Sequence, residues 1–377
     1  MAHTRKRAIL PEFRKKLKAW PIVNLLGPRQ CGKSTFLREL AFRDKTMTYE
    51  TFDLLATRRR AENSPELFLK TVEVFPLVID EVQKVPHIFD ELKAIVDIKR
   101  IPGRYVLTGS MQFSRKIGIR ESLTGRSATV RLDTMSILET RDASPISLAD
   151  CQRYLARGGM PGVCFMREDS VRTNYWEQWL ETICERDLRD FGQGRLSGDL
   201  ARGILEACAT LETPMIADIA KKLQVDSRRI QSHVQALRDL FVLREIAPHE
   251  AGVGKALLLP FDCGLAKTLG ADSRRRWQVW FATEYLNQRA FRGLPLAPLK
   301  FYLTQRGSFI DFVTGTDFHL FCDSPFPSRR AKMTLDAAAR KLSHASFKAY
   351  CPTEHDSVRL GLRQAAVPWA QTASIQE

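Results

Sequence analysis

The stretch that decides the fold covers residues 27–35 and reads Gly27-Pro28-Arg29-Gln30-Cys31-Gly32-Lys33-Ser34-Thr35. It fits the pattern G-x-x-x-x-G-K-[ST], which is typical of a loop that binds phosphate groups. Its glycines let the backbone wrap so that successive N–H groups point into one concavity. A helix beginning at Lys33 adds its positive N-terminal end to the same place. We therefore expect this loop to bind phosphate, with Lys33 reaching the β- and γ-phosphates and the Ser34 hydroxyl binding Mg²⁺.

The flanks of this loop match the context that the pattern requires. Residues 21–26 form a short apolar run, as expected of a buried parallel strand, and residues 35–40 read as a helix. A chance match in an unrelated loop is the alternative, and it leaves these flanks unexplained.

A second motif, residues 75–81, is an apolar strand that ends in Asp80 and Glu81. We expect Asp80 to hold Mg²⁺, directly or through water, and Glu81 to polarise the water that attacks the γ-phosphate. By itself the pattern also fits a strand that ends in solvated acids. Downstream of a phosphate-binding loop, it predicts nucleotide binding and hydrolysis.

Two further segments add candidate residues. Residues 104–110 read as a buried strand, and Thr108 and Ser110 at its end are candidates to position water beside the γ-phosphate; a strand end followed by a turn is the alternative. Arg126, before the last strand at 128–132, is a candidate arginine finger or else a surface arginine. Alternating strands and helices predict an α/β fold with the parallel sheet of a P-loop nucleotide hydrolase.

Composition narrows the class of protein. The 377 residues are 44% hydrophobic and 27% charged, as in a folded chain of two or three domains. No apolar run approaches a membrane span, and the basic N-terminus lacks the apolar stretch of a signal peptide. Eight scattered cysteines indicate a reducing, cytoplasmic location, and seven scattered histidines suggest no structural metal.

A formal net charge of +15 permits binding to nucleic acid or another polyanion, although basic surfaces also aid solubility. Residues 5–18 carry seven lysines and arginines. This segment reads either as a helix packed on the core with a basic outer face or simply as a solvated face.

Residues 200–247 have the spacing of a helix-turn-helix. In the helix from Ser227, Ile230, Val234 and Leu237 are expected to face inward. Arg228, Arg229 and Gln231 would face outward, and these are residue types that read DNA. Residues 241–260 could supply a β wing. DNA contact and protein packing both remain open, because a fold does not fix a function.

With these segments in place, the chain resembles a family of bacterial and archaeal AAA-type ATPases, in which a P-loop domain precedes a winged helix and a C-terminal domain of unknown function. The likeness is carried by GPRQCGKST, LVIDEVQKVP, YVLTGS, SLTGR, RGGMPGV, the helix-turn-helix and SFIDFV. It implies ATP as the nucleotide and Mg²⁺ as the cofactor, with a sensor role near Thr108 and Ser110. It also implies that the strand ending near Thr108 lies between those ending at Gly27 and Asp80.

The family's C-terminal domain looks like a restriction-endonuclease fold, whose metal site needs three acids and a lysine. Glu284 and Asp311 fit the first two positions, but the next strand reads Phe321-Cys322-Asp323 and lacks the lysine. We therefore predict that this domain does not cut nucleic acid and serves as a docking surface. A nuclease with an accessory ATPase is the less favoured reading.

The sequence thus predicts three domains and a connecting segment: a P-loop ATPase domain (1–146), a helical lid or linker (147–199), a winged helix-turn-helix (200–263) and a degenerate nuclease-like domain (264–377). The main hypothesis is a Mg-dependent ATPase whose turnover switches the attached domains, with a protein partner and a homo-oligomer both open. The alternative is an ATP-gated DNA-binding protein with little turnover.

Overall fold

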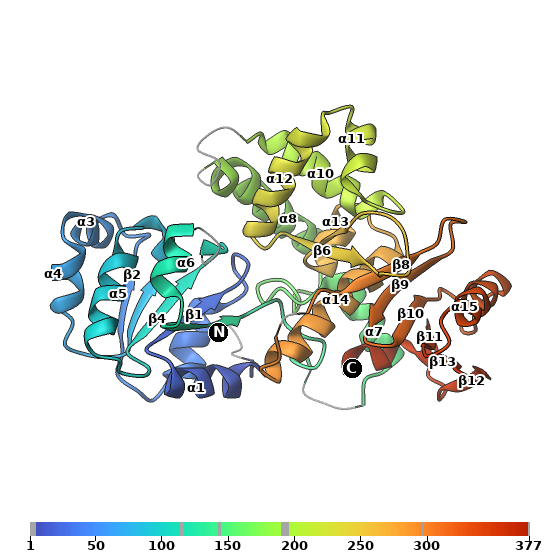
Figure 1. The fold of residues 1–377 in the computed structure, drawn as a ribbon, viewed down its shortest axis with the longest axis horizontal. Coiled ribbons are helices and arrows are strands. Elements are labelled where there is room, and N and C mark those ends of the chain that lie inside the picture. The colour runs from blue at the N-terminus through green and yellow to red at the C-terminus, as the bar shows by residue number, and fades with distance from the viewer. Residues whose placement is uncertain (1–4, 114–116, 142–144, 190–195, 296, 376–377) are drawn as a thin grey trace. The chain divides into compact units, whose positions relative to one another are not determined.

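The computed structural model describes residues 5–113, 117–141, 145–189, 196–295 and 297–375. The chain divides into two compact units (Figure 1). Unit 1 comprises Met1–Asp133 together with two short later segments, Asp239–Phe241 and Arg289–Pro295, and unit 2 comprises the remainder. None of the helices in the described part of the chain has the length and apolar character needed to cross a membrane.

Unit 1 is built on a five-stranded, all-parallel sheet with the order β2-β3-β4-β1-β5. Its strand β4 lies between β1 and β3, so the predicted strand order is confirmed. The strands are β1 (Ile22–Leu26), β2 (Thr48–Thr51), β3 (Leu77–Asp80), β4 (Tyr105–Gly109) and β5 (Ser127–Arg131).

Helices connect these strands, as parallel pairing requires, and one further helix precedes the first strand. They are α1 (Leu10–Ala19), α2 (Lys33–Thr35) continued by the π-helix η1 (Phe36–Ala41), α3 (Leu55–Asn63), α4 (Pro65–Lys70), the short 3₁₀ turn η2 (Val82–Lys84), α5 (Ile88–Ile98) and α6 (Ile117–Leu123).

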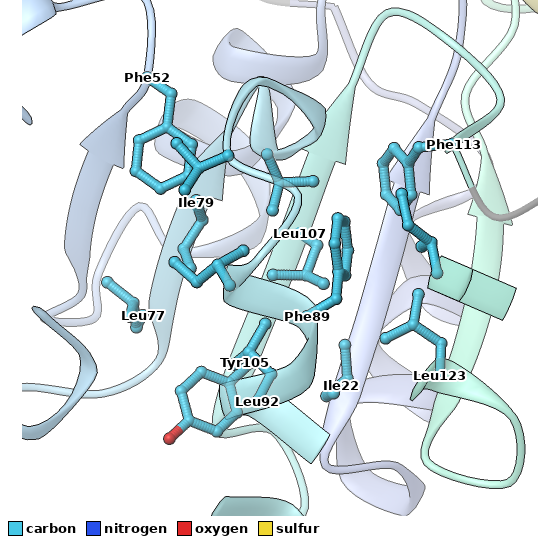
Figure 2. Packing of buried hydrophobic residues seen from close by; sticks show 14 of the residues in the cluster. Ile22, Phe52, Leu77, Ile79, Phe89, Leu92, Tyr105, Leu107, Phe113 and Leu123 are labelled. Atoms are coloured by element: carbon cyan, nitrogen blue, oxygen red, sulfur yellow. The ribbon is translucent and has the colours of Figure 1, made fainter. Parts of the chain in front are cut away.

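Both faces of the unit 1 sheet are buried, which explains why its strands read as continuous apolar runs. On one face, Phe89 and Leu92 of α5 pack against Leu107, Ile79 and Ile22 of the sheet (Figure 2). On the other face, a second cluster joins Val23, Val78, Val106 and Val130 to Phe13 of α1 and Phe36 of η1. Ala290 and Phe291, from the late segment, pack against this second cluster.

Unit 2 begins with helices. They are α7 (Leu148–Arg157), α8 (Asp169–Glu181) continued by the π-helix η4 (Thr182–Asp187), α10 (Gly198–Thr210), α11 (Ile216–Leu223) and α12 (Ser227–Asp239), whose last residue belongs to unit 1. Later come α13 (Cys263–Thr268), the long α14 (Ser273–Phe291), α15 (Arg329–Lys341) and the 3₁₀ segment η5 (Trp369–Ser374).

A mixed, eight-stranded sheet organises unit 2, with the order β12-β13-β11-β10-β9-β8-β6-β7. Its strands are β6 (Leu243–Pro248), β7 (Leu257–Pro260), β8 (Lys300–Leu303), β9 (Phe309–Thr314), β10 (Asp317–Phe321), β11 (Ser346–Cys351), β12 (Val358–Gly361) and β13 (Gln364–Pro368).

The predicted boundary at residue 263 falls within the part of the chain that contributes to this sheet. Residues 241–260, expected to supply a wing, contain the antiparallel pair β6 and β7, which follows α10, α11 and α12 in the chain. However, β6 also pairs in parallel with β8, where Ala247 faces Lys300. Segments on both sides of residue 263 therefore contribute to one sheet, in which β8 lies between β6 and β9.

Candidate functional site

The 27–35 loop follows β1 and runs into α2. One of its glycines is required by a close contact and the other by its backbone conformation. A Cβ atom on Gly27 would lie 1.9 Å from the carbonyl oxygen of Leu132, at the end of the neighbouring strand. Gly32, the residue before α2, has a φ of 95°, which favours glycine. Gln30 also has a positive φ, of 62°, so the loop is tightly curled.

The ammonium group of Lys33 lies against the inside of this loop. It donates to the carbonyl oxygens of Gly27 and Pro28, each at 3.0 Å, and the side chain is buried. The Lys33 ammonium is thus held at the concave side of the backbone, at the start of α2.

The other loop positions differ in exposure. Cys31 is buried, its Sγ donates to Leu132 O at 3.2 Å, and burial raises the pKa of its thiol. Arg29 is half-buried, whereas Gln30, Ser34 and Thr35 are exposed. Ser34 and Thr35 therefore present their hydroxyl groups to solvent beside the buried Lys33.

Asp80 ends β3 at the same edge of the sheet, since the carboxyl ends of parallel strands meet there. Its Oδ2 accepts a hydrogen bond from the Tyr49 hydroxyl at 2.7 Å and lies 3.5 Å from Ser34 Oγ. Its Oδ1 accepts from Thr108 Oγ1 at 3.1 Å. The Asp80 carboxylate thus joins the ends of three strands to the loop.

Glu81 follows with a left-handed backbone, at φ 53° and ψ 42°, which turns its side chain out of the strand. Its Oε2 accepts hydrogen bonds from Ser110 Oγ at 3.1 Å and from the Gln83 amide at 2.5 Å. Thr108 and Ser110, named from the sequence, therefore each contact one of the two acids.

Arg126 lies at the opposite end of the strands, near the start of β1. Ser127, the residue after it, faces Ile22 at the start of β1, whereas the 27–35 loop follows the end of β1. Arg126 forms two 2.6 Å bonds to the Asp97 carboxylate. Within this chain, the length of β1 therefore separates Arg126 from the 27–35 loop.

Three residues at this site were missed by sequence reasoning. The guanidinium of Arg7 is buried and donates to Cys31 O at 3.1 Å and to Asp133 O at 2.6 Å, so it supports the loop from beneath. Tyr49 and Gln83 contact Asp80 and Glu81 as described above. Arg7 and Tyr49 lie outside the motifs, and their partners are distant in sequence; Gln83 lies within LVIDEVQKVP, but the pattern assigns it no role.

On α12, the predicted faces are confirmed by burial. Ile230, Val234 and Leu237 are buried, whereas Arg228, Arg229 and Gln231 are exposed. Asp226 Oδ1 accepts from the backbone N–H groups of Arg228, at 2.8 Å, and Arg229, at 3.4 Å, which fixes the start of the helix.

In the later part of unit 2, Asp311 is buried in β9 and already has three donors. It accepts from Arg274 Nε at 2.8 Å, Gln278 Nε2 at 2.7 Å and the backbone N–H of Phe321 at 2.8 Å. These donors, one of them the cation of Arg274, therefore already satisfy the Asp311 carboxylate.

Glu284 has different partners. Its Oε1 accepts from the backbone N–H of Ile137 at 2.7 Å and from Trp280 Nε1 at 3.1 Å. It lies six positions after Gln278, a partner of Asp311, on α14, which is about 9 Å along a helix axis. Burial raises the pKa of Glu284 to about 8. Glu284 and Asp311 are thus held in separate environments.

Comparisons with known proteins agree with the geometry of unit 1. Two uncharacterized proteins, one from Mycobacterium bovis and one from Mycobacterium tuberculosis, are each 30% identical to this chain over 277 residues. The match covers 71% of this chain, and the chain spans only 60% of the length of each relative. Residues 148–273 match the model of a domain of unknown function (DUF8612), and residues 19–140 match the model of the AAA domain. Residues 19–140 therefore form an AAA-type, ATPase-like domain, which is followed by a domain of unknown function.

Proposed function

We propose that this chain binds ATP with Mg²⁺ at the 27–35 loop and hydrolyses it. The observation that carries the proposal is the meeting of Lys33, Ser34, Asp80 and Glu81 at one edge of the parallel sheet. Backbone N–H groups of the loop and the Lys33 ammonium bind the phosphates, and the ammonium exchanges its loop carbonyls for phosphate oxygens.

The residues beside Lys33 suit a magnesium ion. A serine hydroxyl and a carboxylate, 3.5 Å apart, are the oxygen ligands that Mg²⁺ prefers. When bound, Mg²⁺ neutralises charge on the phosphate oxygens. Tyr49 and Thr108 orient Asp80 for this role through their hydrogen bonds.

Glu81 acts as the general base in this proposal. Ser110 and Gln83 hold its carboxylate, which can then orient water and take its proton. Thr108 and Ser110 thus help to position the two acids as well as water.

Steady-state phosphate release tests the proposal. Lys33→Ala should abolish tight ATP binding, whereas Lys45→Ala, which removes an exposed lysine, should not. Glu81→Gln should keep ATP binding and lower turnover by about 100-fold or more. Chelation of Mg²⁺ should stop turnover in the unchanged protein. Full turnover in Glu81→Gln would remove that residue from the proposed chemistry.

Arg126 is proposed to act in the nucleotide site of a neighbouring copy. In its own chain, it lies at the opposite end of the strands from the 27–35 loop. Arg126→Ala and Glu81→Gln should each be inactive alone. A mixture should regain activity, because Glu81→Gln copies would supply Arg126 to the intact acids of Arg126→Ala copies. A mixture that stays inactive would argue against a finger in trans.

Hydrolysis is proposed to switch the attached winged-helix and C-terminal regions between two arrangements. Protease cleavage of Glu81→Gln with ATP should then differ from cleavage of the same variant with ADP. Identical cleavage patterns would contradict the switch.

DNA binding through α12 is a second candidate function, favoured by the exposed Arg228, Arg229 and Gln231 on one helix face. Duplex DNA should bind with an affinity that falls as salt rises. Arg228→Ala combined with Arg229→Ala should weaken binding and reduce the salt slope, unlike the matched pair Arg189→Ala and Arg202→Ala. An unchanged affinity would point to protein packing instead.

No cleavage of nucleic acid is expected from the later part of unit 2. The donors around Asp311 and the distance of Glu284 along α14 support this reading, as does the missing lysine at residues 321–323. Metal-dependent cleavage that Asp311→Ala abolishes would overturn it.

A further inference from the structure

A small pocket in unit 2 lies beside α7 and the loop that follows it. Its volume is about 110 Å³, which is room for several water molecules. Its lining includes Arg141, Asp150, Arg153 and Arg157, with Phe165 at the wall. Three guanidinium groups and one carboxylate leave the pocket with an excess of positive charge.

The single carboxylate is already used. Asp150 forms a capping box at the start of α7, where it accepts from the backbone N–H of Ser147 at 3.0 Å and from its hydroxyl at 2.6 Å. It also pairs with Arg141 at 2.5 Å and, more distantly, with Arg153 at 3.5 Å. Asp150 therefore has little capacity left to neutralise a third guanidinium.

Arg157 is that third group. It is half-buried, and among the described residues it has neither a hydrogen bond nor an ion pair from its guanidinium. Burial, with the positive charges of Arg172 and Arg153, lowers its pKa. Desolvation and like charges thus disfavour the charged form of Arg157, and a bound anion would favour it.

The backbone fixes Arg157 at the pocket. It is the last residue of α7, and Gly158 and Gly159 follow it in a tight turn. The Asp262 carboxylate accepts from Gly159 N at 2.8 Å and from Gly264 N at 2.7 Å, which ties this turn to the start of α13. The turn of the RGGMPG segment thus holds the arginine in place.

We propose that this pocket binds a phosphate-type oxyanion, held chiefly by the guanidinium of Arg157 with Arg153 and Arg141 around it. Planar, forked guanidinium groups match the geometry of phosphate oxygens and form bidentate, charge-assisted hydrogen bonds with them. The bound anion supplies the counter-charge that Asp150 does not. None of the residues that line this pocket belongs to the 27–35 loop, and the proposal does not rest on ATP hydrolysis.

Calorimetric titration of the full chain with inorganic phosphate tests the site, at constant ionic strength. The titration is done in the Lys33→Ala background, so that the 27–35 loop contributes little. We expect saturable binding, weakened about tenfold or more by Arg157→Gln. Arg202→Gln, which removes an exposed arginine of the same unit, should leave the affinity unchanged. A parallel titration with glycerol 3-phosphate separates free phosphate from a phosphate monoester as the preferred ligand.

Thermal unfolding gives a second readout. Phosphate should raise the Tm of the background and of its Arg202→Gln form, but not of its Arg157→Gln form. Arg157→Lys, which keeps the charge and loses the fork, should bind phosphate severalfold more weakly while remaining folded.

Two outcomes would overturn the proposal. One is the absence of saturable phosphate binding in the background protein. The other is equal affinity in the Arg157→Gln and Arg202→Gln forms, together with a lower Tm for Arg157→Gln without phosphate. That second result would mean that Arg157 serves only the C-terminal end of α7.

Discussion

Arg7 shows how much one residue outside a motif contributes to the candidate nucleotide site. Its buried guanidinium bonds to the carbonyl oxygens of Cys31 in the loop and Asp133 beyond β5. Cys31 lies between β1 and α2, and Asp133 follows β5. One side chain therefore fixes the spacing between these two segments.

We expect Arg7→Met to destabilise unit 1 by about 2–4 kcal/mol, because two buried carbonyl groups would lose charge-assisted hydrogen bonds. ATP affinity should fall as well, since the loop would be less rigid. Urea unfolding and nucleotide titration measure both effects. Lys6→Met removes an exposed charge next in sequence and should change neither quantity. Equal effects of the two substitutions would show that charge alone matters.

At Glu284, burial has a consequence for stability against pH. The folded-state pKa is about 8, above the ordinary 4.5, so the folded protein keeps a proton that the unfolded chain loses. Stability is therefore expected to fall as pH rises from about 4.5 to 8, by up to about 1.4 kcal/mol per pH unit.

Glu284→Gln should remove this contribution. Between pH 6.5 and 8, where Asp262 with its pKa of about 6 no longer contributes strongly, the variant should lose less stability than the unchanged protein. Denaturant unfolding at several pH values measures the slope. Glu206→Gln, at an exposed position, should keep the original slope. Parallel slopes in Glu284→Gln and the unchanged protein would mean that Glu284 is ionised when folded.

At the scale of elements, the turn that follows α7 and is bonded to the start of α13 has a strict backbone requirement. Gly158 has φ 73° and ψ −168°, a region that almost only glycine occupies, and a Cβ there would lie 1.9 Å from Asp262 Oδ1.

Gly158→Ala should therefore destabilise unit 2 by about 3 kcal/mol or more, from strain together with a clash. Gly125→Ala tests strain alone, because Gly125 has φ 72° and nothing within 4 Å of the added atom. It should cost only about 1 kcal/mol. Thermal unfolding of both variants measures the two losses of stability. Similar losses would show that the contact of the added Cβ with Asp262 is easily relieved.

For the whole molecule, the shared sheet of unit 2 makes the chain hard to divide. Removing residues after 263 would take away β8, the parallel partner of β6, and the apolar side chains of α14, among them Trp277 and Trp280. It would also remove Ala290 and Phe291 from the core of unit 1.

A fragment of residues 1–263 should therefore unfold at a lower temperature and expose an open strand edge that favours aggregation. Size-exclusion chromatography and near-UV circular dichroism would show this. A monomeric fragment with native near-UV signal would contradict it and would support the predicted boundary at residue 263.

The sequence by itself determined the parallel sheet of unit 1 and the meeting of Lys33, Ser34, Asp80, Thr108 and Ser110. Apolar runs mark buried strands, and in a parallel sheet the polar residues after such strands share one edge. The helix faces of α12 followed equally from spacing, because helical periodicity is a local property. The roles of these residues remain proposals.

Only the tertiary structure decided the rest. It brought Arg7 and Tyr49 to the site, placed Arg126 at the opposite end of the strands, and joined β6 to β8. It also brought residues 239–241 and 289–295 into unit 1. These arrangements pair segments that are distant in the chain, and local periodicity and spacing carry no information on which distant segments will pack together.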